Sequence, residues 1–285
     1  MSDITNPPLR HVYFLSNRTA ITAETLGHSL LAQFPDQSFS TFTVPFLDST
    51  EKAYKIVNKI NAEFAQSLLK PIVISTMADE EISRIIQKSD ALVLDPFESF
   101  LPDLEQILKV HSIHASGQSH RISNPSLYES RIDAIDFSML HDDGMTTKLY
   151  DQADIIILGV SRSGKTPTCL YLALQFGLKA ANYPITEEDM ESENLPQTIR
   201  QYKTKLFGLT SDPNRLAHIR NERRPNSRYA SIEQCRFEVK AAEQMFEQMR
   251  IPYVNTTTMS IEEISTKIVE VAGLHRISKP VIARV

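Results

Sequence analysis

The sequence predicts an α/β protein, with an N-terminal parallel-sheet α/β domain followed by a P-loop kinase-like α/β domain. Two observations predict this class. Short apolar segments alternate with longer segments of helical period, a pattern typical of parallel sheets whose faces are covered by helices. The chain also has 285 residues, 41% of them hydrophobic, which is enough for two domains that each bury a core.

The first alternating block lies within residues 1–115, the expected N-terminal α/β domain. Four short segments rich in β-branched or aromatic residues are predicted as strands: His11–Ser16, Phe39–Leu47, Pro71–Thr76 and Ala91–Phe97. Thr19–Phe34 and Glu51–Leu69 have helical period and are predicted as helices between them.

Residues 116–145 are predicted as a linker and a connecting helix. Ser112–Asn124 is small and polar, which is typical of a loop. Pro125 near the start of the next segment and Gly144 just past its end are the punctuation expected of a helix.

A second alternating block, residues 146–285, is the expected nucleotide-binding domain. Its predicted strands are Ala153–Val160, Ala180–Ile185 and Lys205–Thr210, and its predicted helices are Lys165–Phe176, Ser211–Glu222 and Ala230–Arg250. Ile251–Thr257 and a final helix, Ile261–Val271, complete the block.

Composition excludes several classes of partner. The net charge is −5, so no basic field indicates binding to nucleic acid or to an anionic membrane. No apolar run has the length of a membrane span, and the N-terminus has no signal-peptide pattern, so we expect a cytoplasmic protein. The sequence leaves open whether the chain forms homo-oligomers.

The clearest motif is G-x-x-x-x-G-K-[ST], which lies between a predicted strand and a predicted helix. Its residues are Gly159, Val160, Ser161, Arg162, Ser163, Gly164, Lys165 and Thr166. The glycines let successive backbone N–H groups point at phosphate oxygens, Lys165 supplies a positive charge, and the Thr166 hydroxyl can bind Mg²⁺. The motif predicts a nucleotide-phosphate site.

An arginine-rich segment follows the third strand of this block and allows two interpretations. It contains Arg215, Arg220, Arg223, Arg224 and Arg228. These arginines could clamp the phosphates during transfer, with Arg215 as a candidate catalytic residue, or they could form a solvated helix face. Nearby, Asp212 could bind Mg²⁺ through water or simply cap the helix that it precedes.

Two acids at the end of the connecting helix are further candidates. Asp142 and Asp143, in "HDDG", oppose the helix dipole and so do not stabilise the helix. A carboxylate there could orient a hydroxyl group or take its proton, so we consider both acids candidate catalytic residues.

Several long motifs resemble a known family. "GVSRSGKTPTCLYLA", "LFGLTSDPNRLAHIR", "SRYASIEQCRFEV" and "SRIDAIDFSMLHDDG" are similar to the bacterial phosphoenolpyruvate synthase regulatory proteins, relatives of the pyruvate, phosphate dikinase regulatory proteins. The resemblance covers about His11 to Leu274. It implies a bifunctional serine/threonine kinase and phosphorylase that acts on phosphoenolpyruvate synthase.

The resemblance implies the cofactors and chemistry as well. ADP would be the phosphoryl donor to an active-site threonine of the synthase, and inorganic phosphate would remove the phosphoryl group as pyrophosphate, with Mg²⁺ expected. The ADP-binding loop would be Gly159–Thr166, and a basic patch around Arg220–Arg228 would meet the partner. One loop departs from the family, since Ser16-Asn17-Arg18-Thr19 replaces the usual Ser-Asp-Gly-Thr, and we assign it no catalytic role.

Two other functions remain open from the residues alone. A P-loop kinase that transfers phosphate from ATP to a small metabolite would account for the second domain but would not need the first. A regulator that binds ADP without chemistry would leave no phosphate on its partner.

Overall fold

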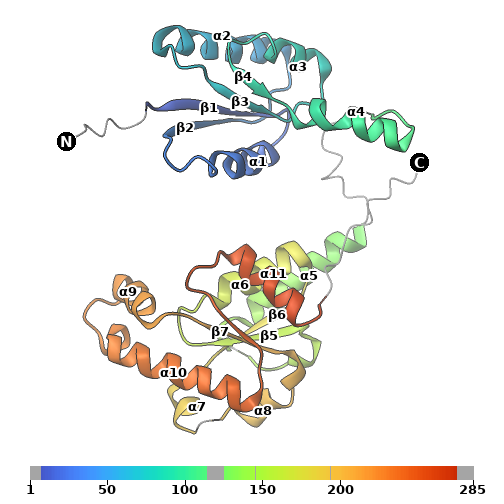
Figure 1. The fold of residues 1–285 in the computed structure, drawn as a ribbon. Helices are drawn as coiled ribbons and strands as arrows, with labels where there is room; N and C mark the ends of the chain where they lie inside the picture. Colours follow the sequence, from blue (N-terminus) through green and yellow to red (C-terminus); the bar gives the residue numbers. More distant parts are fainter. Residues whose placement is uncertain (1–7, 114–124, 145, 193, 275–285) are drawn as a thin grey trace, which may run out of the picture. The chain divides into compact units, whose positions relative to one another are not determined.

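The computed structural model describes residues 8–113, 125–144, 146–192 and 194–274. The chain divides into two compact units, residues 1–121 and 122–285, each built on a four-stranded parallel sheet (Figure 1). The predicted fold class is therefore confirmed. Most of the predicted loop, residues 114–124, lies outside the described residues.

The N-terminal unit has strand order β2-β1-β3-β4. Its strands are β1 (Arg10–Leu15), β2 (Phe39–Val44), β3 (Ile72–Ser75) and β4 (Leu92–Leu94), and its helices are α1 (Ile21–Leu31), α2 (Thr50–Ser67), α3 (Glu80–Ile86) and α4 (Pro96–Leu108).

Alternate residues of β1 face opposite sides of this sheet and bury two separate cores. Tyr13 and Leu15 pack with α2 and α3, whereas Val12 and Phe14 pack with α1. Figure 1 shows α2 and α3 on one side of the sheet and α1 on the other.

The C-terminal unit has strand order β6-β5-β7-β8, again fully parallel. Its strands are β5 (Ile155–Gly159), β6 (Ala180–Pro184), β7 (Leu206–Thr210) and β8 (Tyr253–Asn255). Its helices are α5 (Pro125–Leu140), α6 (Lys165–Tyr171), α7 (Glu187–Glu191), α8 (Gln197–Arg200), α9 (Pro213–Arg223), α10 (Ile232–Met249) and α11 (Ile261–Val271). A π-helical turn, Leu172–Phe176, extends α6.

The same alternation along β5 buries two cores in this unit. Ile156 and Leu158 pack with α10, and Ile155 and Ile157 pack with α6 and α11. Figure 1 shows α6 and α11 on one side of the sheet and α7 and α10 on the other. Helices cover both faces of this sheet. In such sheets, ligands bind at the carboxyl ends of the strands.

Several strands are shorter than the sequence indicated, among them β2, β4 and β8, and β4 shows a clear reason. Ala91–Phe97 was expected as a strand, but β4 ends at Leu94 because Asp95 accepts hydrogen bonds from the amides of Phe97 and Glu98 and so caps α4. Pro96 then occupies the first turn of that helix, where its missing N–H has no intrahelical partner.

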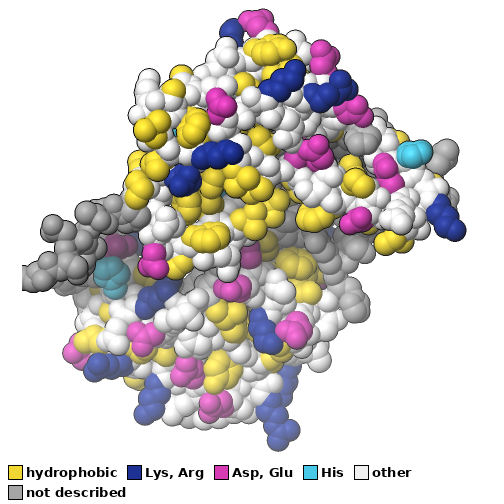
Figure 2. All heavy atoms as spheres, turned by 45° about the horizontal axis from the view of Figure 1, so that its top comes forward, with side chains coloured by type: hydrophobic (Ala, Val, Ile, Leu, Met, Phe, Trp, Pro, Cys, Tyr) yellow, Lys and Arg dark blue, Asp and Glu magenta, His cyan; other side chains and the backbone are white. Residues whose placement is uncertain are grey.

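The surface carries charges of both signs. Figure 2 shows Lys and Arg side chains interspersed with Asp and Glu on the face in view. Among the described residues, no helix is both long and apolar enough to cross a membrane.

Candidate functional site

The phosphate-loop motif lies at the carboxyl end of β5, inside the strand order of the second sheet. Residues 160–164 join β5 to α6. β6 flanks β5 on one side and β7 on the other, so the chain leaves β5 at the point where the strand order reverses. In open parallel sheets, this position is where ligands bind.

Both glycines of the motif are required by the local geometry. A Cβ atom on Gly159 would lie 2.7 Å from the Leu209 carbonyl oxygen and 2.5 Å from Ser163 Oγ. Gly164, the N-cap of α6, has φ +97°, a left-handed conformation that a side chain disfavours. Close packing at Gly159 and the left-handed backbone at Gly164 therefore both favour glycine in this loop.

Lys165 is buried beneath the loop. Its side chain is 4% exposed, and Nζ donates a hydrogen bond to the Val160 carbonyl oxygen at 3.1 Å. Burial lowers the pKa of Lys165 to about 8, although the nearby carboxylates of Asp143 and Asp142 act in the opposite direction. The lysine is thus poised to gain from an anion placed beside it.

Thr166 joins the motif to the acids of the preceding turn. Its hydroxyl donates to Asp142 Oδ1 at 2.8 Å. Asn182 Nδ2 lies 2.5 Å from the same oxygen, 3.1 Å from Thr166 Oγ1 and 3.3 Å from Asp143 Oδ1. The structure therefore brings Asp142, Asp143 and Thr166 together around one amide group.

The turn that carries the two acids is held firmly in place. The ring nitrogens of His141 each lie 2.7 Å from a carbonyl oxygen, that of Phe137 on one side and that of Lys148 on the other. Asp143 has φ +47°, which turns the chain sharply after α5. The backbone N–H of Asn182 donates to the backbone carbonyl of His141 at 3.0 Å and so fixes this turn to β6.

Arg220 is an internal anchor of the loop. Its side chain is fully buried, and its guanidinium donates to the Ser161 carbonyl at 2.9 Å and to Glu238 Oε2 at 2.6 Å. The hydroxyl of Ser161 also pairs with that of Tyr229 at 2.8 Å. Since Arg220 is buried, the prediction that it contributes to a surface patch is wrong.

The other four arginines of the segment are exposed. Arg215 donates to the Thr257 carbonyl, and Arg228 forms an ion pair of 3.7 Å with Glu187. Arg223 and Arg224 end α9. Among the five arginines of this described segment, only Arg220 donates hydrogen bonds to the phosphate loop.

Asp212 has the geometry of a helix cap. Its Oδ1 accepts hydrogen bonds from the amides of Asn214 at 2.9 Å and Arg215 at 3.0 Å, at the start of α9. Its own amide donates to the Thr257 hydroxyl at 2.7 Å. The carboxylate thus serves the helix N-terminus in this structure.

Three residues of the site escaped the sequence analysis. Asn182 is the one polar residue in the buried first part of β6, a signal that could have marked it. Glu238 partners Arg220 from α10. The Thr256 hydroxyl donates to the Ser163 carbonyl at 3.2 Å and ties the end of β8 to the loop.

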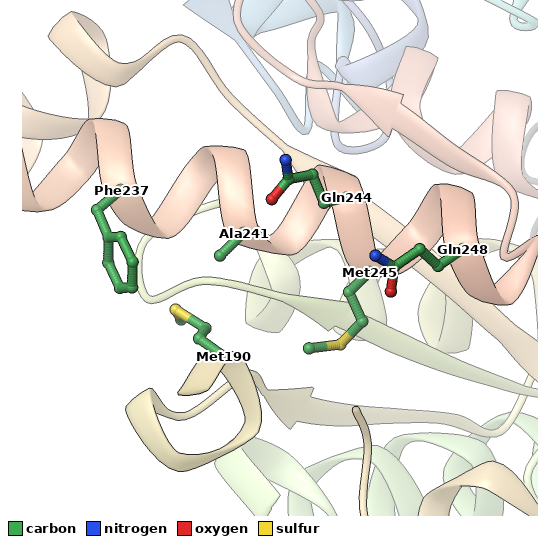
Figure 3. Close-up of a pocket in the computed structure, with 6 residues that line it drawn as sticks. All are labelled: Met190, Phe237, Ala241, Gln244, Met245 and Gln248. Carbon is green, nitrogen blue, oxygen red and sulfur yellow. The ribbon is translucent and has the colours of Figure 1, made fainter. Parts of the chain in front are cut away.

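Two hollows lie away from the motif. One, of about 90 Å³, lies between α7 and α10 and is lined by Met190, Phe237, Ala241, Gln244, Met245 and Gln248 (Figure 3). The other, of about 270 Å³, is in the N-terminal unit next to Asp95 and Arg84. Neither of these two hollows is lined by a residue of the phosphate loop.

Comparison with known proteins gives consistent matches over nearly the whole chain. The model of a family described as kinase/pyrophosphorylase matches residues 12–269. A protein of Legionella pneumophila (strain Corby) named "Putative phosphoenolpyruvate synthase regulatory protein" is 52% identical over 267 residues, 94% of this chain and 98% of that protein. Proteins of the same name from Marinobacter nauticus and Pseudomonas fluorescens are each 51% identical over the same shares.

Proposed function

Because this chain belongs to the kinase/pyrophosphorylase family, we propose that it regulates phosphoenolpyruvate synthase by adding a phosphoryl group to an active-site threonine and removing it again. ADP is the donor in the first reaction, and inorganic phosphate is the acceptor in the second. The names of its relatives support the choice of partner.

The observation that carries the proposal is the junction of the phosphate loop with an acidic turn. Lys165 and the loop amides supply positive charge. The carboxylate of Asp142 accepts a hydrogen bond from Thr166, the last residue of the loop motif. Phosphoryl transfer depends mainly on positioning and electrostatic stabilisation, and both kinds of group stand side by side here.

In the proposed kinase reaction, the threonine oxygen of the synthase attacks the β-phosphorus of ADP. The bond from that phosphorus to the bridging oxygen breaks, and AMP leaves with the electron pair. Asp142 or Asp143 orients the hydroxyl and takes its proton. Lys165 balances the charge that develops on the phosphates, and exposed Arg215 is the further candidate for this role.

In the proposed phosphorylase reaction, which removes the phosphoryl group, an oxygen of inorganic phosphate attacks the phosphorus of phosphothreonine. The bond to the threonine oxygen breaks, that oxygen takes a proton, and pyrophosphate is released. A nest of amides that binds the β-phosphate of ADP is equally suited to inorganic phosphate. Mg²⁺, when bound, supplies charge neutralisation to either reaction, and the hydroxyl and carboxylate oxygens around Thr166 are ligands of the kind it prefers.

The test is to incubate the chain with phosphoenolpyruvate synthase, phosphoenolpyruvate and either ADP or ATP, and to locate new phosphate by mass spectrometry. We expect phosphothreonine with ADP free of ATP, and its loss with release of pyrophosphate when phosphate is added. The Lys165→Ala variant should abolish the ADP-dependent reaction.

Two results would replace this function by another. Phosphorylation of a small metabolite from ATP, with no mark on the synthase, would indicate a metabolite kinase. Tight ADP binding with an unchanged mass of the synthase would indicate a regulator without chemistry. Full activity of Lys165→Ala would remove the phosphate loop from the mechanism.

A further inference from the structure

We propose that Asp142, Asp143, Thr166 and Asn182 form a binding site for one hard divalent cation, Mg²⁺ in the cell, beside the phosphate loop. The proposal deepens the proposed function, on which it rests for the nucleotide that would share the cation. It assigns the acidic ligands to the turn before β5, and it excludes Asp212 from the site.

The first argument is the crowding of oxygens around one amide nitrogen. Asn182 Nδ2 has three oxygen neighbours, at 2.5, 3.1 and 3.3 Å. An amide NH₂ group has only two hydrogens, so it can donate to two of these oxygens at most. The hydrogen of the Thr166 hydroxyl is already donated to Asp142. Three oxygens, two from the turn Asp142–Gly144 and one from α6, thus converge on one NH₂ group that cannot fully satisfy them.

The second argument is that the side-chain oxygen of the same residue, Asn182 Oδ1, lacks a hydrogen-bond partner among the described residues. Asn182 is fully buried. A buried acceptor without a partner is costly and calls for an explanation. Rotation of the terminal amide by about half a turn would place Oδ1 among the three oxygens, where a cation would bind it.

The electrostatics support a cation at this position. Asp142 and Asp143 present two carboxylates to the same point, and the hydrogen bond of Lys165 goes to the Val160 carbonyl instead. The NH₂ group of Asn182 donates toward both carboxylates, so this point of the structure already favours positive charge. Asp143 is exposed, so an ion can reach the site from solvent.

The donor set selects the kind of ion. Two carboxylates, a hydroxyl and an amide oxygen are hard ligands, which suit Mg²⁺ or Mn²⁺ rather than zinc. No group of three or more His, Cys, Asp or Glu side chains with metal-site geometry occurs in the described ranges, so a dedicated zinc cage is not part of them. Mg²⁺ commonly uses one or two carboxylates and completes its shell with water and phosphate.

Asp212 is the rival acid, and its contacts argue against it. Its carboxylate accepts two backbone amides at the start of α9. Asp142, by contrast, lies 24 residues before Thr166 in the chain and is hydrogen-bonded to it at 2.8 Å. The acidic partner of the P-loop hydroxyl therefore comes from upstream of the loop.

The test is a titration of the full-length chain with Mn²⁺, followed by electron paramagnetic resonance, with and without ADP. We expect one bound ion per chain and a loss of affinity of about tenfold or more in Asp142→Asn, which keeps the shape of the side chain. The matched control is Asp212→Asn, which keeps a capping side chain and should bind Mn²⁺ as the wild type does.

A second variant separates a ligand from a merely structural residue. Asn182→Asp should bind Mn²⁺ about threefold or more tightly if position 182 supplies an oxygen to the ion. If Asn182 serves only to donate hydrogen bonds to the acids, the same change adds a third carboxylate without a counter-ion and should destabilise the turn. Circular dichroism at increasing temperature identifies any variant that fails to fold.

Each outcome decides the question. No bound Mn²⁺ in the wild type, or weakening by Asp212→Asn and not by Asp142→Asn, overturns the cation site while leaving the proposed phosphotransfer intact. Mn²⁺ bound through Asp142 in a chain that binds no ADP supports the site and overturns the proposed function instead. Weaker Mn²⁺ binding by a folded Asn182→Asp removes position 182 from the ligand set.

Discussion

In both units, the strand that begins the sheet lies inside the strand order and is followed by a connection of the same length. Residues 16–20 join β1 to α1, and residues 160–164 join β5 to α6. The N-caps of the two helices, Ala20 and Gly164, are both left-handed, with φ of 63° and 97°. The two sheets therefore offer the same place to a ligand.

The residues at that place differ in the ways that matter for phosphate. Leu15 ends β1 where Gly159 ends β5, and Ile21 begins α1 where Lys165 begins α6. Ile21 is 56% exposed, whereas Lys165 is 4% exposed. The comparison teaches that strand order positions a loop, and that the proposed phosphate site depends in addition on glycine and lysine at fixed points in that loop.

The two loops are also held differently. The amides of Phe46 and Leu47 donate to the carbonyls of Arg18 and Ser16, so backbone contacts hold the first loop. Side chains hold the second, chiefly the guanidinium of Arg220. A loop that depends on side-chain anchors should be sensitive to point substitutions.

The largest effect should follow from Arg220→Met. Its loss leaves Glu238 buried without its cation, which costs about 3–5 kcal/mol of folding free energy, and it releases the Ser161 carbonyl. Denaturant unfolding of the C-terminal unit, together with an ADP titration, measures both consequences.

The matched control is Arg223→Met, at an exposed position of the same helix, where the change should stay within about 0.5 kcal/mol. Equal effects of the two substitutions would show that Arg220 does not anchor the loop. Glu238→Gln added to Arg220→Met should recover part of the lost stability, because it removes the unpaired charge.

Gly159→Ala should have the next largest effect. The new Cβ would lie 2.7 Å from the Leu209 carbonyl, so strand or loop must shift at a cost of about 1–3 kcal/mol, and ADP affinity should fall with it. Unfolding and calorimetric titration with ADP provide the two readouts.

Gly164→Ala is the paired variant, because its Cβ would have no neighbour within 4 Å and only the φ of +97° opposes it. We expect a cost of about 1 kcal/mol there. If Gly164→Ala proved more harmful than Gly159→Ala, backbone conformation rather than close packing would control the loop.

The sequence predicted those parts of the site whose chemistry is local. The phosphate motif needs only its own residues, and the structure places it between a strand and a helix as expected. Asp142 and Asp143 were recognisable as acids at the wrong end of a helix for its dipole. Two sheets of alternating strands and helices also followed from periodicity alone.

The remainder depended on contacts between distant segments. Asn182 meets Asp142 only because β6 pairs with β5, and the order of strands is not encoded in any local pattern. The sequence pattern favoured Arg220 as part of a basic surface patch, whereas Glu238, on another helix, pairs with it inside the core. Pairing of this kind is set by tertiary packing, not by residue type or spacing.

A smaller effect concerns pH and distinguishes the buried Lys165 from an exposed lysine. Since the pKa of Lys165 is about 8 in the nucleotide-free chain, raising the pH above 8 removes the proton that ADP binding requires. ADP affinity should therefore fall by about tenfold between pH 7 and pH 9. Calorimetry in buffers of different ionisation enthalpy should record proton uptake at the higher pH.

Lys165→Arg is the control, because a guanidinium keeps its charge throughout this range and should flatten the pH profile whatever it does to affinity. A wild-type affinity that stays constant from pH 7 to pH 9 would mean that Lys165 remains charged despite its burial. The two loops would then differ in having a lysine or an isoleucine at this position, and not in a lowered lysine pKa.

The smallest effect is expected from a graft onto the first unit. Ala20→Gly and Ile21→Lys together reproduce the end of the phosphate motif at the start of α1, in a chain that also carries Lys165→Ala. We expect no recovered binding of ADP or inorganic phosphate by calorimetry. Leu15 still ends the strand where Gly159 allows close approach in the second unit, and the described hydrogen bonds to the carbonyls of the first loop come from backbone amides rather than from a buried guanidinium.

Recovered binding with a dissociation constant of about 1 mM or lower would contradict this expectation, since that affinity exceeds weak non-specific association. It would mean that strand order, a glycine and a lysine suffice, and that the side-chain anchors of residues 160–164 serve stability alone. Absence of binding, with α1 still protected in hydrogen exchange, would instead show that the tight approach at Gly159 and the anchor at Arg220 are part of the phosphate site itself.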